Sequence, residues 1–265
     1  MAEPVELLHP VHEIALQAGR EILKIYAADI EVTHKDDDSP LTQADLASHH
    51  CLVEGLKKLT PDIPILSEEG EMPDYETRAG WHWYWLIDPL DGTREFIKRN
   101  GEFTVNVALI HNGHPVLGVV YAPALDVSYF AAQGSGAWKQ EDSGPYDAIT
   151  TRRVEGKLSI VASRSHRSEE LEALLDGMPE HSEVSVGSSL KFCQVAEGRA
   201  DFYPRLGLTS EWDTAAGQCV VEQAGGLVTT LDFKPLAYNS KESLLNPFFL
   251  VFGDPTHHWQ QYFPE

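Results

Sequence analysis

The segment from Trp85 to Thr93, with the sequence WLIDPLDGT, most constrains what this chain can fold into. Its apolar start predicts a buried strand, and Pro89, which has no N–H to donate, is expected to end the sheet pairing. Asp88 and Asp91 would then lie at the C-terminal end of a strand, where α/β proteins bind their ligands. Two carboxylates this close repel each other unless a divalent cation lies between them. Taken alone, the segment fits a metal site and an ordinary turn equally well.

The composition narrows the class of protein. Among 265 residues, 41 Asp and Glu face 20 Lys and Arg, so the net charge of −21 argues against a protein that follows nucleic-acid phosphates with a basic face. Three cysteines without a C-x-x-C pair predict buried thiols in a reducing cytoplasm, and neither disulfides nor a zinc site. No apolar run approaches about 18 residues, and the first residues do not resemble a signal peptide. We therefore expect a cytoplasmic protein without a transmembrane segment.

Helical and strand patterns alternate along the chain, which predicts an α/β fold. Helices are expected at 4–28, 42–59, 169–175 and 190–197 and from Trp212 onward, with a short one at the C-terminus. Strands are expected at 63–66, 84–87, 103–110, 116–121, 127–131, 158–162, 184–186, 200–203, 227–230 and 248–252. Asn112 and Gly113 predict a hairpin turn between two of them. Gly, Ser and Pro between 134 and 145 suggest a single catalytic domain, 1–265, built from two tightly packed subdomains, 1–145 and 146–265.

Four carboxylates occupy strand ends or helix starts: Glu68, Asp88, Asp91 and Asp213. Each has an ordinary structural explanation, but together they favour a metal site. Four such groups can hold two Mg²⁺ ions about 3.5–4 Å apart, the arrangement that supports phosphoryl transfer. Asp45 is explained by a capping box in which Thr42 is the N-cap.

Several residues suit a phosphate ligand. Gly92 and Thr93 can offer backbone N–H groups, and Ser188 and Ser189 precede a predicted helix whose N-terminus favours anions. Lys191 and Arg205 could bind a second phosphate, although a surface charge is the simpler explanation for Lys191 alone.

Two motifs carry a family resemblance. The segments 85–93 (WLIDPLDGT) and 212–217 (WDTAAG) resemble the signature motifs of the inositol monophosphatase-like, lithium-sensitive phosphatases. The segments 39–45, 66–69, 93–104, 187–193 and 203–205 resemble the CysQ-type 3′(2′),5′-bisphosphate nucleotidases, except that Arg94 replaces the usual Lys. The resemblance covers nearly the whole chain. It implies a five-layer αβαβα sandwich of the α/β (α+β) class, roughly two or three Mg²⁺ ions per active site, and inhibition by Li⁺.

The resemblance also implies roles for individual residues. The implied metal ligands are Glu68, Asp88, Asp91, Asp213 and the backbone carbonyl of Leu90. Thr93, with Asp45 or Glu68, would activate the attacking water. The implied substrate contacts are Glu68, Leu90, Asp91, Gly92, Thr93, Ser188, Lys191, Arg205 and Asp213, with Arg164 and His166 as further candidates near the nucleoside.

By this resemblance the chain is a phosphatase that removes the 3′-phosphate of adenosine 3′,5′-bisphosphate, giving AMP and phosphate without a covalent intermediate, in the recycling of sulfated nucleotides. An inositol monophosphatase or sugar phosphatase of the same superfamily is the alternative, and a non-catalytic nucleotide-binding module is a further one. A haloacid-dehalogenase-type phosphatase is disfavoured because two residues separate Asp88 from Asp91, where its motif has one. The expected partner is a small nucleotide and not a nucleic acid. The oligomeric state and peripheral association with the cytoplasmic face of the inner membrane are left open.

Overall fold

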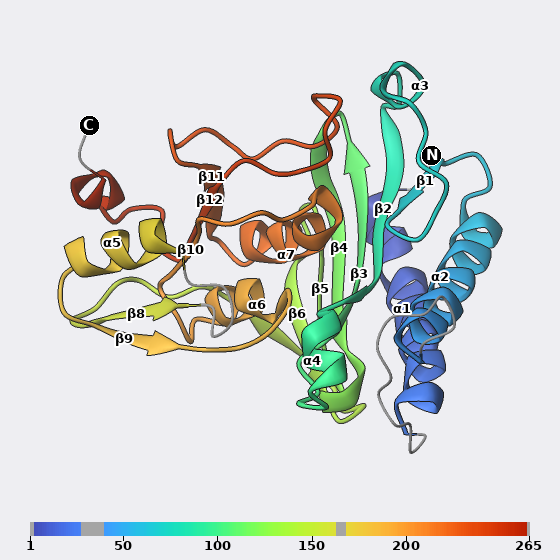
Figure 1. Cartoon of the computed structure of the whole chain (residues 1–265), viewed down its shortest axis with the longest axis horizontal. Helices are drawn as coiled ribbons and strands as arrows, with labels where there is room; N and C mark the ends of the chain where they lie inside the picture. Colours follow the sequence, from blue (N-terminus) through green and yellow to red (C-terminus); the bar gives the residue numbers. More distant parts are fainter. Residues whose placement is uncertain (1–2, 28–39, 163–167, 264–265) are drawn as a thin grey trace.

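The computed structural model describes residues 3–27, 40–162 and 168–263. Figure 1 shows five layers, as the family resemblance predicts. Helices α1 (Pro4–Tyr26) and α2 (Pro40–Leu59) cover one face of a seven-stranded sheet. Helices α6 (Leu190–Ala196) and α7 (Glu211–Gln223) lie between this sheet and a five-stranded sheet. Helix α5 (Glu169–Gly177) forms the outermost layer beyond the second sheet.

The first sheet follows the chain in order, from β1 to β7. Its strands are β1 (Ile65–Ser67), β2 (Trp83–Asp91), β3 (Thr104–His111), β4 (His114–Ala122), β5 (Val127–Ala132), β6 (Gly136–Glu141) and β7 (Tyr146–Ile149). Strands β1 and β2 are parallel, and each later strand runs antiparallel to the one before it. Short helices α3 (Tyr75–Ala79), α4 (Thr93–Ile97) and η1 (Pro123–Leu125) lie in its connections. Asn112 and Gly113 both have positive φ, which confirms the predicted hairpin turn.

The second sheet has the order β11-β12-β10-β8-β9. Its strands are β8 (Leu158–Val161), β9 (His181–Val184), β10 (Phe202–Arg205), β11 (Leu227–Thr230) and β12 (Phe249–Phe252), and η2 (Trp259–Tyr262) follows them. Strand β8 is parallel to both β9 and β10, whereas β12 is antiparallel to β10 and β11. The strands on either side of residues 150–157 thus belong to different sheets. The division into subdomains near residue 145 stays a prediction.

The small residues at the start of α7 let it lie directly on the first sheet. A Cβ atom built on Gly118 of β4 would come within 2.4 Å of the Ala216 carbonyl, so only a glycine fits at this crossing. Ala215 and Ala216 are small and buried on the helix side of this contact, and a Cβ atom built on Gly217 would come within 2.6 Å of Phe192 of α6. The small residues therefore allow the close packing that the sequence predicts, against both the sheet and α6. This contact sets the position of Asp213 one turn earlier.

Some predicted boundaries are wrong. Strand β2 does not end at Asp88, because a register shift between Asp88 and Asp91 absorbs Pro89 and pairing resumes at Asp91. Helix α2 starts at Pro40, a favoured residue for the first turn, so Thr42 lies inside the helix and is not its N-cap. Cys193 and Cys219 are buried thiols as expected, whereas Cys51 is only half-buried. In the part of the chain that is described, none of the helices combines the length and apolar character needed to cross a bilayer.

Candidate active site

The parallel pairing of β1 and β2 brings two carboxylates to the same edge of the first sheet. Ser67, the last residue of β1, pairs with Ile87 of β2, and β2 continues from there to Asp91. The next residue on each strand is acidic, and the Glu68 N–H donates to the Ile87 carbonyl at 3.3 Å. Asp88 is almost fully buried, while Glu68 is exposed. The predicted juxtaposition of acidic strand ends is therefore present in the fold.

Asp213 reaches the same edge from the middle layer. It is the third residue of α7, and its carboxylate accepts a hydrogen bond of 2.9 Å from the N–H of Ser210, completing a capping box. Glu68, Asp88 and Asp213 each offer one oxygen atom, and these atoms lie within 4.8 Å of one another. Three carboxylates from a strand end, a strand and a helix start thus form one cluster, which we call the acidic cluster.

Asp91 lies beside this cluster at the end of β2, opposite Thr104 of β3. Its Oδ2 accepts a hydrogen bond from the Ser189 hydroxyl at 3.0 Å and a longer one from the Thr104 hydroxyl at 3.4 Å. The negative charge of Asp91 also raises the pKa of Asp213, after the effect of burial itself. The fourth predicted ligand is therefore held in place by two hydroxyl groups.

The electrostatics of the site favour a bound cation. Burial, followed by repulsion from Asp91, holds the pKa of Asp88 well above its usual range and raises that of Asp213 to about 8. Partial loss of contact with water raises the pKa of Glu68 even though its side chain is exposed on one side, and burial raises that of Asp45 to about 8 with help from Glu69 and Glu68. A divalent cation removes this repulsion, and ligands that are all oxygen match Mg²⁺. The residues present fit the metal that the family resemblance implies.

The bulge in β2 is fixed by hydrogen bonds to its backbone. The N–H of Leu90 donates to Asp88 Oδ1 at 3.0 Å, and the Ser48 hydroxyl of α2 donates to the Pro89 carbonyl at 2.7 Å. Gly92 follows with φ of +99°, and a Cβ built there would lie 2.0 Å from Ser188 Oγ. Only glycine meets both conditions.

A cavity of about 360 Å³ opens next to the acidic cluster, large enough for a small ligand. Its walls include the predicted substrate contacts Asp91, Gly92, Thr93, Ser188, Lys191, Arg205 and Asp213. Thr93 begins α4 and is exposed. Leu90 is buried and is not part of the wall.

Two cations face this cavity from the second half of the chain. Lys191 donates from Nζ to the Ser188 carbonyl at 2.9 Å, and burial lowers the pKa of its ammonium group. Arg205 lies at the end of β10 and donates from Nη2 to the Leu208 carbonyl at 3.1 Å. Its Nε is buried and has no hydrogen-bond partner among the residues that the structure describes.

Most of the predicted site residues therefore lie around one cavity or in the acidic cluster beside it. Asp45 lies half-buried on α2, close enough for Glu68 to affect its pKa. Arg164 and His166 lie outside the described residues. Sequence reasoning missed Thr104 and Asn106 of β3, although two polar residues at alternate positions of an apolar strand were a usable signal.

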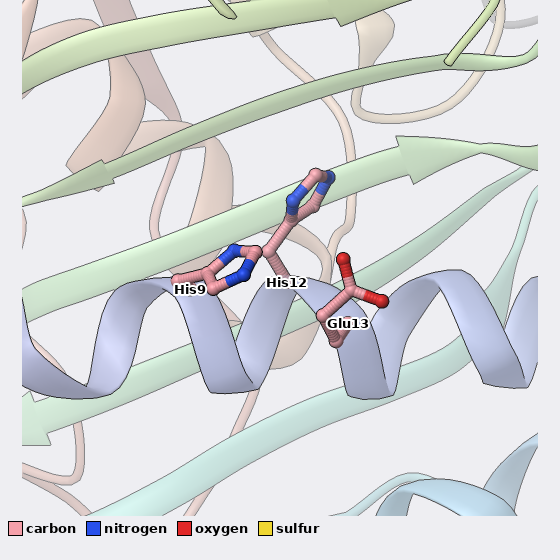
Figure 2. A group of neighbouring side chains, drawn as sticks. All are labelled: His9, His12 and Glu13. Carbon is pink, nitrogen blue, oxygen red and sulfur yellow. The ribbon is translucent and has the colours of Figure 1, made fainter.

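A second group of possible metal ligands lies on α1, far along the chain from the motifs. His9, His12 and Glu13 each bring one ligand atom within 4.8 Å of the others, and Figure 2 shows the His12 ring reaching toward the strands. His12 is fully buried; its Nε2 bonds Ser128 Oγ at 2.8 Å, and its ring stacks on Phe130 at 4.3 Å between centroids. Burial lowers its pKa to about 4, so the ring is neutral. These contacts attach α1 to β5, and we assign the group no ligand.

Comparison with known proteins agrees with the fold and the motifs. A model of the inositol monophosphatase family matches residues 4–259. The 3′(2′),5′-bisphosphate nucleotidase CysQ of Salmonella typhimurium is 53% identical over 247 residues, which cover 92% of this chain and 99% of that protein. The crystal structure of CysQ from Bacteroides thetaiotaomicron is 42% identical, with a TM-score of 0.84 over 92% of this chain and 96% of that one. An inositol monophosphatase from Anabaena is 27% identical, with a TM-score of 0.75 over 94% and 90% of the two chains. The chain therefore belongs to the inositol monophosphatase family, as its two sequence motifs predict.

Proposed function

We propose that this protein is a Mg²⁺-dependent 3′(2′),5′-bisphosphate nucleotidase that converts adenosine 3′,5′-bisphosphate to AMP and phosphate. The observation that carries the proposal is that Asp91 and Asp213 line the same cavity as Lys191 and Arg205. A substrate with two phosphates needs a metal site for one and fixed cations for the other. The names of the relatives that are 51–53% identical support the same activity.

The carboxylates of the acidic cluster, with Asp91 and the carbonyl of Leu90, would hold Mg²⁺. Bound Mg²⁺ would supply a Lewis acid that neutralises phosphate charge and makes water more acidic. The chain prepares this site by burying Asp88 and by fixing Asp213 with its capping hydrogen bond to Ser210. The fixed geometry avoids reorganisation of the protein during the reaction.

The reaction is a direct displacement at phosphorus. A water oxygen forms a bond to the 3′-phosphorus, the bond from phosphorus to the 3′-oxygen breaks, and that oxygen gains a proton. Asp45, or Thr93 together with Glu68, takes the proton that the water loses. The described part of the cavity wall contains no Cys and no His. The hydroxyls of Ser188 and Ser189 donate to Asp91, and Lys191 donates to a backbone carbonyl instead of accepting a proton from either serine, so the proposal contains no covalent intermediate.

The second half of the chain holds the part of the substrate that does not react. We assign Lys191 and the guanidinium group of Arg205 to the 5′-phosphate, because both residues line the cavity, and Ser188 borders the same space. Gly92 and Thr93 offer backbone N–H groups toward the reacting phosphate at the start of α4. The negative charge of the whole chain does not prevent anion binding, because bound metal ions reverse the local field.

One set of assays tests the proposal. Phosphate release is measured from adenosine 3′,5′-bisphosphate, inositol 1-phosphate and fructose 1,6-bisphosphate, with Mg²⁺, with and without Li⁺. We expect the highest kcat/KM for the nucleotide, no turnover without Mg²⁺, and inhibition by Li⁺. A higher kcat/KM for inositol 1-phosphate would favour an inositol monophosphatase, and binding of the nucleotide without phosphate release would favour a non-catalytic module.

The remaining predictions concern the setting of the enzyme. A small nucleotide bisphosphate is the proposed partner, and the cytoplasm is the proposed compartment because three unpaired thiols suit a reducing environment. Peripheral association with the inner membrane stays a prediction, as does the division of the catalytic domain into two subdomains.

A further inference from the structure

We propose that Ser189 and Asn106 are positioning residues that orient the Asp91 carboxylate for Mg²⁺. Neither residue belongs to the set of metal ligands described above. The inference rests on the proposed function only in so far as Asp91 is a metal ligand. It adds a second layer of hydrogen bonds behind that ligand, the kind of support that tunes metal affinity.

The Ser189 hydroxyl occupies the meeting point of three elements. Its Oγ lies 3.0 Å from Asp91 Oδ2 on β2 and 2.7 Å from the Asp213 carbonyl on α7. The side-chain amide of Asn106 on β3 donates to the same oxygen at 2.9 Å. Ser189 is 1% exposed and Asn106 is 0% exposed, so water does not compete for these bonds.

The amide of Asn106 determines where the single hydroxyl hydrogen of Ser189 can point. The Ser189 oxygen accepts from Asn106 Nδ2, so its own hydrogen is directed to the acceptors, Asp91 Oδ2 and the Asp213 carbonyl. With the amide reversed, Ser189 would donate to Asn106 instead and turn a lone pair toward the Asp91 carboxylate. That arrangement is repulsive, so the observed direction of the chain of hydrogen bonds is the favourable one.

Asn106 is costly to bury, which indicates a role beyond packing. Its Oδ1 is buried and has no hydrogen-bond partner among the residues that the structure describes. Its neighbours on β3, Val105 and Val107, are apolar and fully buried. A purely structural position here would be filled more stably by an apolar side chain. Asn106 also lies directly opposite Asp88 in the pairing of β2 with β3, so its amide sits within the group of proposed ligands.

A hydrogen bond to Oδ2 stops the Asp91 carboxylate from rotating. The direction in which the other oxygen, Oδ1, points is thereby fixed as well. The same hydroxyl connects the ligand from the first sheet with the backbone of the ligand from the middle layer. We therefore assign Ser189 and Asn106 to the geometry of the metal site, and expect them to govern metal affinity more than substrate affinity.

The test compares Ser189→Ala, Asn106→Leu and the double variant with the unchanged protein. Binding of Mg²⁺ is measured by titration calorimetry without substrate, and unfolding by urea in the absence of metal. Each single variant is expected to bind Mg²⁺ about 10–100-fold more weakly. The double variant should be no weaker than the weaker single variant, because the two residues act in series. Ser128→Ala is the matched control: it removes a buried hydroxyl with a hydrogen bond of 2.8 Å to His12, remote from the proposed ligands, and should leave Mg²⁺ binding unchanged.

Stability separates positioning from packing. Asn106→Leu removes an unpaired buried oxygen, so we expect it to unfold at the same or a higher urea concentration than the unchanged protein while binding Mg²⁺ more weakly. Loss of stability with Mg²⁺ affinity within twofold of the unchanged protein would overturn the proposal, as would a protein that binds no Mg²⁺. If the variants lose Mg²⁺ affinity but the unchanged protein releases no phosphate from the nucleotide, this inference stands and the proposed function fails.

Discussion

The Ser188 hydroxyl donates a hydrogen bond of 2.9 Å to the backbone carbonyl of Asp91. The two residues are 97 positions apart and join the end of β2 to the loop before α6. Ser188 has φ of +48°, an uncommon conformation for a serine, and it borders the cavity. The contact holds the loop before α6, the proposed anion-binding side, at a fixed distance from the proposed metal ligands at the end of β2.

Gly92→Ala tests how close this contact must be. A methyl group at residue 92 would meet Ser188 Oγ at 2.0 Å and would also sit at φ of +99°, so both strain and a clash result. We expect a loss of about 1–3 kcal/mol in the free energy of unfolding and at least a tenfold fall in kcat/KM. Urea unfolding and phosphate release measure the two effects.

The control for this change is Gly134→Ala. Gly134 has a similar φ of +80°, but nothing lies within 4 Å of a Cβ built there. The Gly134→Ala variant should lose only the smaller part of the free energy of unfolding, the part that comes from backbone strain at positive φ, and should keep its activity. Equal activity of the two variants would show that the approach of Ser188 to Gly92 is not needed.

Asp88→Asn separates the chemical role of this carboxylate from its structural role. The change removes a buried charge that Asp91 and Glu68 repel, so the metal-free protein should melt at the same or a higher temperature. Turnover with Mg²⁺ should fall more than about 100-fold because one ligand loses its charge. Calorimetric melting and phosphate release check both parts. Unfolding of the variant, or more than about a tenth of the activity remaining, would contradict a metal-binding role.

Arg205→Met tests the assignment of the second phosphate. A lost charge-assisted hydrogen bond of about 1.5–3 kcal/mol should raise KM for adenosine 3′,5′-bisphosphate roughly 10–100-fold. Adenosine 3′-monophosphate lacks the 5′-phosphate, so its KM should change little. Arg153→Met removes an exposed arginine outside the cavity wall and should affect neither substrate. Equal losses for both substrates would place Arg205 at the reacting phosphate instead.

We predict that Glu222→Gln changes the stability of the protein by an amount that depends on pH. Burial raises the pKa of Glu222 from its ordinary value of 4.5 to about 7, and its Oε1 accepts a hydrogen bond of 2.8 Å from Gln218. The folded protein therefore holds this proton more tightly than the unfolded chain, and stability is lost as the pH rises from about 4.5 through 7. Glutamine keeps the acceptor but cannot ionise.

Urea unfolding at pH 5.5 and 8.5 checks this prediction. The variant should be more stable than the unchanged protein by about 1–3 kcal/mol at pH 8.5, and by clearly less at pH 5.5. The same difference at both pH values would mean that ionisation of Glu222 does not affect stability. Because Glu222 is not part of the cavity wall, kcat/KM should stay unchanged.

The sequence predicted the layers and the acidic cluster well for identifiable reasons. Glu68 and Asp88 each follow a short apolar stretch that predicts a strand, and both predicted strands are present as β1 and the first part of β2. Asp213 comes at the start of a helix that the sequence predicts from Trp212 onward, and α7 begins one residue earlier, at Glu211. These features depend on local sequence patterns. The family resemblance added the expectation that the carboxylates belong to one metal site.

Other features depended on contacts that no local pattern reveals. The pairing of β2 continues past Pro89 because Thr104 of β3 is available as a partner for Asp91. Asn106 lies in a strand that is buried on both faces, so its polar character stands out only when the partner Ser189, 83 residues later, is known. The five residues of α4 are too few for a helical period to be recognised.

The proposed metal ligands and the proposed phosphate-binding cations come from different parts of the fold, so the two groups can change independently. The proposed metal ligands Glu68, Asp88 and Asp91 come from the first sheet, whereas Lys191 and Arg205 come from α6 and β10. Changes in the second group would alter which leaving group is accepted and leave the hydrolytic machinery in place. Exchange of residues 190–209 between relatives, which keeps Ser188 and Ser189 in place, is therefore a direct route to new substrate selectivity with unchanged hydrolytic residues.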